Sequence, residues 1–133
     1  MKSTIAMLLI WLAGCVPIPA MEGYATYYTE QSCKREGTSG ILTASGARYD
    51  ESKMTCALPK ATAKAWNIKY GASVLITNMM NGRTVIAKYT DRGPGRLARS
   101  RKVIVDLTPA AMIALAGKDG IKAGKIKVRI ERI

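Results

Sequence analysis

The stretch KYTDRGPGRLARSRKVIVDLT, residues 88–108, determines how the rest of the sequence is interpreted. It places two aspartates, Asp91 and Asp106, among six lysines and arginines, each where an apolar run ends. A glycine–proline turn at 93–94 follows the first aspartate. The two carboxylates could only cap turns, or they could be the working acids of a site whose substrate is itself acidic.

The residues just before this stretch predict a β-hairpin. Two strand-like runs, 73–78 and 84–89, flank Asn81-Gly82. This dipeptide between two strands is typical of a type I′ turn, which needs a positive φ at both central positions. Both runs are nearly continuously apolar, so we expect strands that are buried on two faces.

Further strands are predicted on either side of the hairpin. Residues 23–28 are rich in β-formers, and 102–106 form another apolar run. Residues 125–133 alternate strictly, which indicates a strand with one buried face and one exposed face. About six short strands at close spacing favour a small closed β-barrel in a mainly β domain.

One or two short helices complete the predicted domain. Thr108 is a good N-cap, Pro109 suits the first helical position, and Gly117 suits the C-terminal end, so a helix is predicted over 109–116. A second short helix is expected at 61–66, after Pro59, and 29–48 is expected to be a loop.

The N-terminal residues have the pattern of an export signal. Lys2 precedes an apolar run too short to span a bilayer as a helix. Leu12-Ala13-Gly14-Cys15 then resembles a bacterial lipobox, which implies cleavage before Cys15 and acylation of its thiol. Ordinary cleavage after Ala20 is the alternative. The expected organisation is a signal peptide at 1–14, a lipidated tether at 15–22 and one domain at 23–133, on the periplasmic side of the envelope and anchored in the outer membrane.

The remaining cysteines favour a disulfide. With Cys15 lipidated, Cys33 and Cys56 remain, and an exported chain folds in an oxidising compartment, where an even pair is more often bridged than free. The chain contains no histidine, which argues against a zinc site. No cofactor or metal is expected.

The formal net charge of +12 suggests an acidic partner. For an exported protein this favours the carboxylate-rich peptides of the cell wall or anionic lipid. Nucleic acid fits the charge but not the leader. A generally soluble basic surface is the simpler alternative.

Several motifs stand in the order and spacing found in the rare lipoprotein A (RlpA) family. They are Leu42-Thr43-Ala44-Ser45-Gly46, Tyr49-Asp50, Met54-Thr55, Asn81-Gly82, Thr90-Asp91-Arg92-Gly93-Pro94 and Val105-Asp106-Leu107-Thr108. The resemblance covers residues 23–133. It implies a six-stranded double-psi β-barrel, a lipoprotein anchor in the envelope, and binding or lytic cleavage of peptidoglycan. Division or envelope proteins would be further partners. The same barrel occurs in expansins and family-45 endoglucanases.

The opening Gly23-Tyr24-Ala25-Thr26-Tyr27 also resembles that of bacterial expansins. There, the threonine and the aspartate of the later Asp-Leu motif line the polysaccharide groove. The resemblance therefore implies that Thr26, Asp91 and Asp106 line a groove in this chain.

Two positions depart from the RlpA pattern. The family usually carries a glutamate directly after Thr-Ala-Ser-Gly and a histidine shortly after Met-Thr; here residue 47 is alanine, and histidine is absent. Two functions are therefore considered. One is an endolytic transglycosylase with Asp106, Asp91 and Asp50 as catalytic carboxylates. The other is a non-catalytic, expansin-like module that binds or loosens the wall.

Glycoside chemistry makes Asp106 the leading candidate acid. Hydrolysis needs two carboxylates, whereas in a lytic transglycosylase the sugar's own 6-hydroxyl closes onto the anomeric carbon, so one acid that later acts as base can suffice. The structural alternative for Asp106 is a hydrogen bond at the turn or helix start near Thr108. For Asp91 and Asp50 it is a hydrogen bond within their own turns. The expected substrate-binding residues are Thr26, Tyr28, Glu30 and Arg92. Between the two aspartates, Arg96, Arg99, Arg101 and Lys102 could pair with wall carboxylates or form a solvated basic loop.

Overall fold

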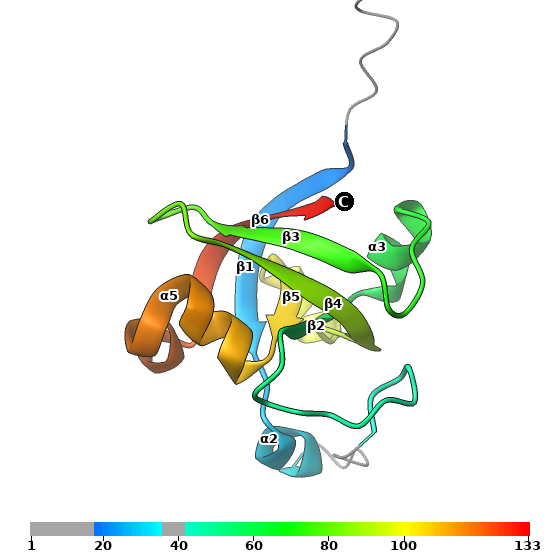
Figure 1. Ribbon diagram of the computed structural model, residues 1–133, viewed down its shortest axis with the longest axis horizontal. Helices are drawn as coiled ribbons and strands as arrows, with labels where there is room; N and C mark the ends of the chain where they lie inside the picture. Colours follow the sequence, from blue (N-terminus) through cyan, green and yellow to red (C-terminus); the bar gives the residue numbers. More distant parts are fainter. Residues whose placement is uncertain (1–17, 36–41) are drawn as a thin grey trace, which may run out of the picture.

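Six strands close into a barrel in the order β1-β5-β2-β4-β3-β6 (Figure 1). The computed structural model describes residues 18–35 and 42–133, without the side chains of 33–35. The strands are β1 Ala20–Tyr27, β2 Thr55–Leu58, β3 Ser73–Asn78, β4 Thr84–Arg92, β5 Val103–Leu107 and β6 Lys125–Arg132. Closure leaves no unpaired sheet edge, and the predicted small closed barrel is confirmed.

The barrel repeats one pairing pattern twice. β1 is parallel to β5 and antiparallel to β6, and β4 is in the same way parallel to β2 and antiparallel to β3. Each parallel pair contains one register shift, which leaves Ile104 in β5 and Thr90 in β4 as extra residues. The β2–β5 and β3–β6 pairs, both antiparallel, join the two halves.

Aliphatic side chains from every strand fill the barrel interior. Nine of them are 0% exposed: Ala25, Leu58, Val74, Ile76, Ala87, Val105, Leu107, Val128 and Ile130. Burying each Val, Leu or Ile contributes about 1.5–3 kcal/mol. The expectation that β3 and β4 are buried on two faces is wrong, because burial alternates along β3 and Ile86 of β4 is 58% exposed. One face of these strands fills the barrel and the other meets solvent.

The β3–β4 hairpin forms as predicted, but its turn differs. Five residues, 79–83, connect the strands, and the N–H of Gly82 donates to the carbonyl oxygen of Asn78 at 2.8 Å. Gly82 has a φ of +75°, whereas Asn81 is not in the positive-φ region, so the turn is not type I′. The side-chain amides of Asn78 and Asn81 both donate to the carbonyl oxygen of Leu115, at 3.0 and 2.9 Å. This docking of the loop on a helix accounts for the longer turn.

That helix is α5, Pro109–Ala123, which packs against β4 and β6 at one end of the barrel (Figure 1). The predicted start is confirmed, because the Thr108 hydroxyl accepts a backbone N–H of the first turn. Gly117, with φ +63° and ψ −162°, interrupts the helix near its predicted end. The chain then continues in helical form to Ala123 and ends on Gly124 in the left-handed conformation.

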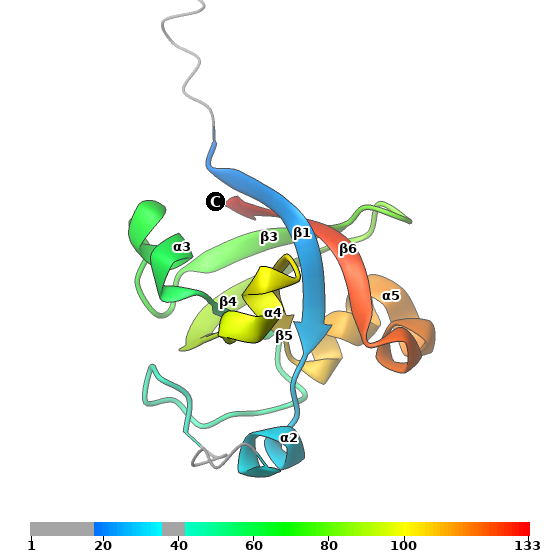
Figure 2. The ribbon, with the colours of Figure 1, turned by 180° about the vertical axis from the view of Figure 1, so that it is seen from behind.

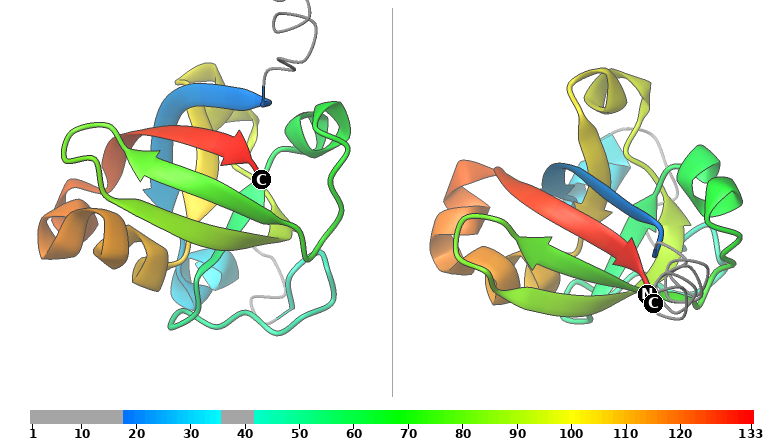
Figure 3. Two further views of the ribbon diagram at one scale, coloured as in Figure 1. Left: turned by 45° about the horizontal axis from the view of Figure 1, so that its top comes forward. Right: turned by 90° about the horizontal axis from the view of Figure 1, so that it is seen from above.

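Three shorter helices surround the barrel (Figure 2). α3, Lys60–Ala65, agrees with the predicted helix at 61–66. α2, Glu30–Arg35, lies in the predicted loop, and α4, Arg96–Ser100, was not predicted. α3 and α5 lie on opposite sides of the barrel (Figure 3). No helix in the described ranges combines the length and apolar character needed to cross a bilayer.

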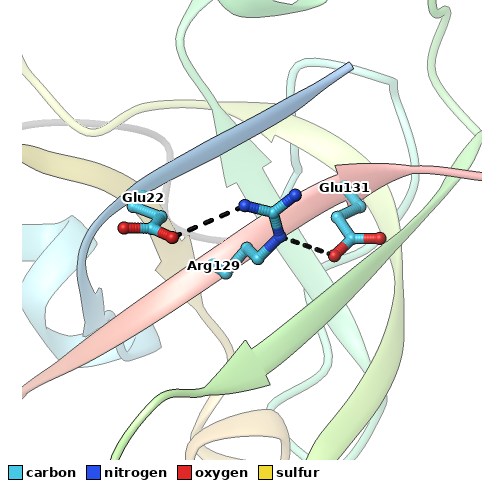
Figure 4. A network of polar contacts seen from close by, with 3 residues as sticks. All are labelled: Glu22, Arg129 and Glu131. Atoms are coloured by element: carbon cyan, nitrogen blue, oxygen red, sulfur yellow. Dashed lines mark hydrogen bonds and ion pairs between the residues drawn. The ribbon is translucent and has the colours of Figure 1, made fainter. Parts of the chain in front are cut away.

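The barrel begins earlier than the sequence suggested. Residues 20–22 pair with β6, starting at Ala20 opposite Glu131, so they are part of the barrel. On the outer surface Arg129 of β6 joins Glu22 at 3.5 Å and Glu131 at 2.8 Å (Figure 4). The hydrogen bond to Glu131 is the main cause that raises the pKa of Arg129.

The predicted Cys33–Cys56 disulfide is not present. Cys56 is a free thiol that is 0% exposed among the core side chains. It faces the barrel interior, whereas α2, which carries Cys33, lies outside the barrel (Figure 2); the side chain of Cys33 is outside the described part. Burial, and then the charge of Asp106, raise the pKa of Cys56 to about 12. Cys15 also lies outside the described residues.

Candidate active-site cleft

A cleft of about 1030 Å³ lies on the outer wall of the barrel. Its floor is made by residues of β1, β5, β2 and β4. On one side stands the segment 92–101, which includes α4. On the other stand Tyr28, Ser32, Leu42 and Tyr49.

A row of residues in strand register forms the floor. Thr26 of β1 is opposite Asp106 of β5, Asp106 is opposite Ala57 of β2, and Ala57 is opposite Asp91 of β4. On the far side of β1, Lys125 of β6 is opposite Thr26. All five line the cleft. The two aspartates are therefore separated by two strand spacings, roughly 10 Å between their backbones.

A β-bulge turns Asp91 toward the cleft. Cys56 pairs with Tyr89, and the next residue, Ala57, pairs with Asp91, so Thr90 is the extra residue. Strict alternation would place Tyr89 and Asp91 on the same face. Because of the bulge, Tyr89 is 4% exposed and belongs to the core, while Asp91 lines the cleft.

Asp106 has close neighbours on both carboxylate oxygens. The Thr26 hydroxyl donates a hydrogen bond to its Oδ1. A Cβ added at Gly93 would lie 3.1 Å from its Oδ2, so the glycine leaves room for this oxygen. Gly93 also has a φ of +150°, and its N–H donates to the carbonyl oxygen of Leu58 at 3.2 Å. Glycine is therefore needed at position 93 for both backbone conformation and space.

Asp91 fastens one wall of the cleft to the floor. Its Oδ1 accepts the backbone N–H of Ala44 at 3.0 Å and that of Arg92 at 2.9 Å. The N–H of Ser45 donates to the carbonyl oxygen of Thr90 at 3.1 Å. The segment 42–49, which contains the Thr-Ala-Ser-Gly motif, is thereby held against β4. One oxygen of Asp91 thus has a structural task.

The same segment is also braced internally. The Thr43 hydroxyl donates to the carbonyl oxygen of Ala47 at 2.9 Å and lies 2.7 Å from the Ser45 hydroxyl. The ring of Tyr49 stacks on that of Tyr28, with centroids 4.7 Å apart, and its hydroxyl donates to the carbonyl oxygen of Tyr28. These contacts give the cleft a preformed aromatic wall.

Five of the seven predicted site residues line the cleft: Thr26, Tyr28, Asp91, Arg92 and Asp106. Arg92 is exposed, and its Nε donates to the Tyr70 hydroxyl at 2.7 Å. Among the described residues the guanidinium of Arg92 forms no ion pair with Asp91.

The structure does not bring Asp50 and Glu30 to the cleft. Asp50 is exposed and lines a separate cavity of about 280 Å³. Its Oδ1 accepts the hydroxyl of Ser52 at 2.6 Å and the N–H of Ser52 at 2.9 Å; these bonds lower the pKa of Asp50. This is the turn geometry that was the structural alternative. Glu30 is in the first turn of α2, where its N–H donates to Oε1 of Glu51 at 2.9 Å.

Two cationic residues of the cleft were not predicted from the sequence. Lys60 follows β2, and Lys125 begins β6, and both line the cleft although neither lies in a recognisable motif. Strand register places Lys125 opposite Thr26, and Lys60 is the first residue of α3. Within the described residues, no group of three His, Cys, Asp or Glu side chains is arranged to hold a metal ion.

The topology and the cleft define the class of protein. Two parallel strand pairs cross within one closed six-stranded sheet, which is the double-psi β-barrel. A solved expansin of Clavibacter michiganensis, a D78N mutant in complex with cellohexaose, superposes with a TM-score of 0.60 at 19% identity. The match covers 86% of this chain and 50% of that one. Streptomyces papain inhibitor superposes with a TM-score of 0.58 at 26% identity, covering 88% of this chain and 97% of that one.

Sequence comparison identifies the family. The family described as lytic transglycolase matches residues 20–130. A Treponema pallidum (strain Nichols) protein named "Probable endolytic peptidoglycan transglycosylase RlpA" is 35% identical over 124 residues, 93% of this chain. The chain belongs to the lytic transglycolase family of RlpA-like domains. It spans about a third (32%) of the length of that relative.

Proposed function

We propose that this protein binds glycan strands of peptidoglycan in the cleft and cleaves them as an endolytic transglycosylase. The observation that carries the proposal is the row Thr26–Asp106–Ala57–Asp91, which brings a hydroxyl and two carboxylates from three strands to the floor of one open cleft. The names of the RlpA relatives support peptidoglycan as the substrate. The two tyrosines of the wall offer flat faces for sugar rings.

Asp106 acts as the acid in this proposal. Its carboxyl group donates a proton to the glycosidic oxygen while the bond from that oxygen to the anomeric carbon breaks. The 6-hydroxyl oxygen of the same sugar forms a new bond to the anomeric carbon, and its proton passes to the Asp106 carboxylate. No water is consumed, the acid is regenerated, and the product carries an internal 1,6-anhydro ring.

The neighbours of Asp106 suit this cycle. Thr26 donates to Oδ1, which orients the carboxyl group. Gly93 keeps the space beside Oδ2 open. A single positioned acid suffices because the nucleophile belongs to the substrate, so the binding of Asp91 to backbone amides is compatible with turnover.

The test is product release from purified glycan strands. Asp106→Asn keeps the shape of the side chain but removes the acid, and we expect release of anhydro-muropeptides to fall by at least 100-fold, as loss of general acid catalysis typically does. Asp119→Asn is the matched control, because Asp119 is an exposed residue of α5 that does not line the cleft. If Asp106→Asn releases product at the wild-type rate, the assignment of the acid is refuted.

A non-catalytic role is the second candidate. It is favoured by the alanine at position 47, by the absence of histidine from the sequence, and by the use of Asp91 Oδ1 as a backbone acceptor. In that case the protein binds or loosens the wall as an expansin-like module. Co-sedimentation with the wall, without any anhydro product from the wild-type protein, would establish the binder and exclude the enzyme.

We also propose that the protein is exported and anchored by lipid on Cys15. The support is the lipobox-like Leu12-Ala13-Gly14-Cys15 and its place five residues before β1. Growth with labelled palmitate should label the wild-type protein and leave Cys15→Ala unlabelled. Equal labelling of the two proteins would contradict the anchor. Fractionation would then show whether the anchor is in the outer membrane.

A further inference from the structure

The side wall of the cleft made by α4 carries a concentration of positive charge. Arg96 and Arg99 lie one turn apart on α4, and Arg101 follows it directly. All three are exposed and line the cleft. No acidic side chain lies in the segment 92–101.

These arginines are not consumed by intramolecular ion pairs. In the ranges 18–35 and 42–133, none of the three is joined to an aspartate or glutamate, whereas Arg129 on β6 has two such partners. Exposed cations placed beside a cleft with no counter-ion remain available to an anionic ligand.

Two further cations lie at other points of the cleft. Lys125 is at the Thr26 end of the floor, and Lys60 follows β2. The aspartates lie in the floor, and the cations stand around them. A neutral sugar chain would form no charge pairs with these five cations. The cleft also exposes Leu97 of α4, 68% exposed between the arginines, an apolar contact for the carbon-bound face of a sugar ring.

We propose that Arg96, Arg99 and Arg101 bind carboxylates carried by the glycan strand, so that the cleft selects an anionic wall glycan over a neutral glycan of the same linkage. This inference rests on the proposed function for its ligand. It concerns binding and not cleavage, and it does not depend on Asp106 acting as an acid. Carboxylates on such a strand come from two sources, the lactyl groups of the muramyl sugars and the stem peptides.

The experiment measures dissociation constants for four ligands. They are glycan strands with stem peptides, strands stripped of peptides that keep their lactyl carboxylates, the same stripped strands with the carboxylates amidated, and neutral chitin oligosaccharide. The variant is R96Q/R99Q/R101Q. The matched control K118Q/K122Q/K127Q removes the same charge from exposed positions of α5 and β6 outside the cleft.

We expect the cleft variant to bind carboxylate-bearing strands about tenfold more weakly than the wild type, as three exposed charge pairs would give. Its affinity for amidated strands and chitin should stay within twofold. Wild-type affinity for the anionic strands should fall with added salt, and that of the cleft variant should fall less. Peptide-bearing strands binding more tightly than stripped strands would assign the stem peptides, and equal binding would assign the lactyl groups.

Three outcomes overturn the inference. They are an equal loss of affinity in the control variant, an equal loss for amidated strands, and no binding of the wild-type protein to carboxylate-bearing strands. If the wild-type protein releases no product, the proposed catalysis is refuted. If the wild-type protein and Asp106→Asn nevertheless both bind carboxylate-bearing strands selectively, this inference stands. The two failures are therefore distinguishable.

Discussion

The attachment of the cleft wall to Asp91 can be tested by removing its carboxylate. Asp91→Ala deletes both hydrogen bonds that Oδ1 accepts, from the N–H of Ala44 at 3.0 Å and from that of Arg92 at 2.9 Å. Hydrogen bonds to a charged acceptor contribute about 1.5–3 kcal/mol each when buried. Ala44 and Arg92 are exposed and Asp91 is half-buried, so in the variant water can replace part of the lost hydrogen bonding. We expect a combined loss of about 1–2 kcal/mol in the free energy of unfolding.

Asp91→Asn separates the contribution of shape from that of charge. The amide oxygen can still accept both N–H groups, so we expect this variant to lose less than half as much stability as Asp91→Ala. For a domain of this size, 1 kcal/mol corresponds to a shift in Tm of roughly 5 °C. Thermal unfolding of the two variants at neutral pH therefore gives the ranking directly.

Amide hydrogen exchange locates the effect. In Asp91→Ala the N–H of Ala44 should exchange at least tenfold faster than in the wild type, because its acceptor is gone, while amides of α5 keep their rates. Unchanged exchange at Ala44, or equal Tm values for the alanine and asparagine variants, would refute the claim that Asp91 holds this wall. Slower cleavage by Asp91→Ala alone would not distinguish a loose wall from a lost acid.

Three further predictions follow from single contacts. Gly93→Ala places a Cβ 3.1 Å from Oδ2 of Asp106 at a φ of +150°, so turnover should fall at least tenfold. The control is Gly95→Ala, whose added Cβ would meet nothing within 4 Å and which should keep both activity and Tm. Equal effects of the two substitutions would contradict the close approach of Gly93 to Asp106. Cys56, buried and with its pKa raised to about 12, should resist thiol reagents from pH 7 to 10 until the protein unfolds, and rapid labelling of the native protein would contradict its place in the core. Because the pKa of Asp50 is lowered in the folded protein, its ionised carboxylate stabilises the fold at pH values above the unfolded-state pKa of 3.8, and this contribution is lost as the pH falls through the folded-state pKa. Asp50→Asn should therefore reduce Tm at pH 7 but not at a pH below both pKa values, and cleavage should be unchanged. A loss of turnover at constant Tm would instead show that Asp50 acts in the site.

Local signals in the sequence were sufficient for several elements. Thr108, Pro109 and Gly117 predicted a helix over 109–116, because capping and backbone conformation depend on residues within one turn. The strict alternation of 125–133 predicted β6, since side-chain direction along a regular strand has a period of two. The hairpin was also predicted, but its turn was not, because Asn81 is held by Leu115 of a helix that comes later in the chain.

The candidate site was predictable only in part. The motifs pointed to Thr26, Asp91 and Asp106, and the structure places all three in one cleft. Asp50 belonged to the same set of motifs, yet its carboxylate is used by a local turn. Nothing in a linear sequence distinguishes an aspartate that caps its own turn from one that faces a cleft.

The sequence by itself determined the local content of this protein: the helix at 109–116, the alternating last strand, the hairpin, and a set of acids among basic residues. These features depend on neighbours a few positions apart. Only the tertiary structure decided which way the acids face and what surrounds them. The bulge at Thr90 turns Asp91 outward and Tyr89 inward, and closure of the barrel brings Lys125 beside Thr26. Such register is set by pairing between strands far apart in the chain, which must fill one interior together, and no residue of a strand specifies it alone.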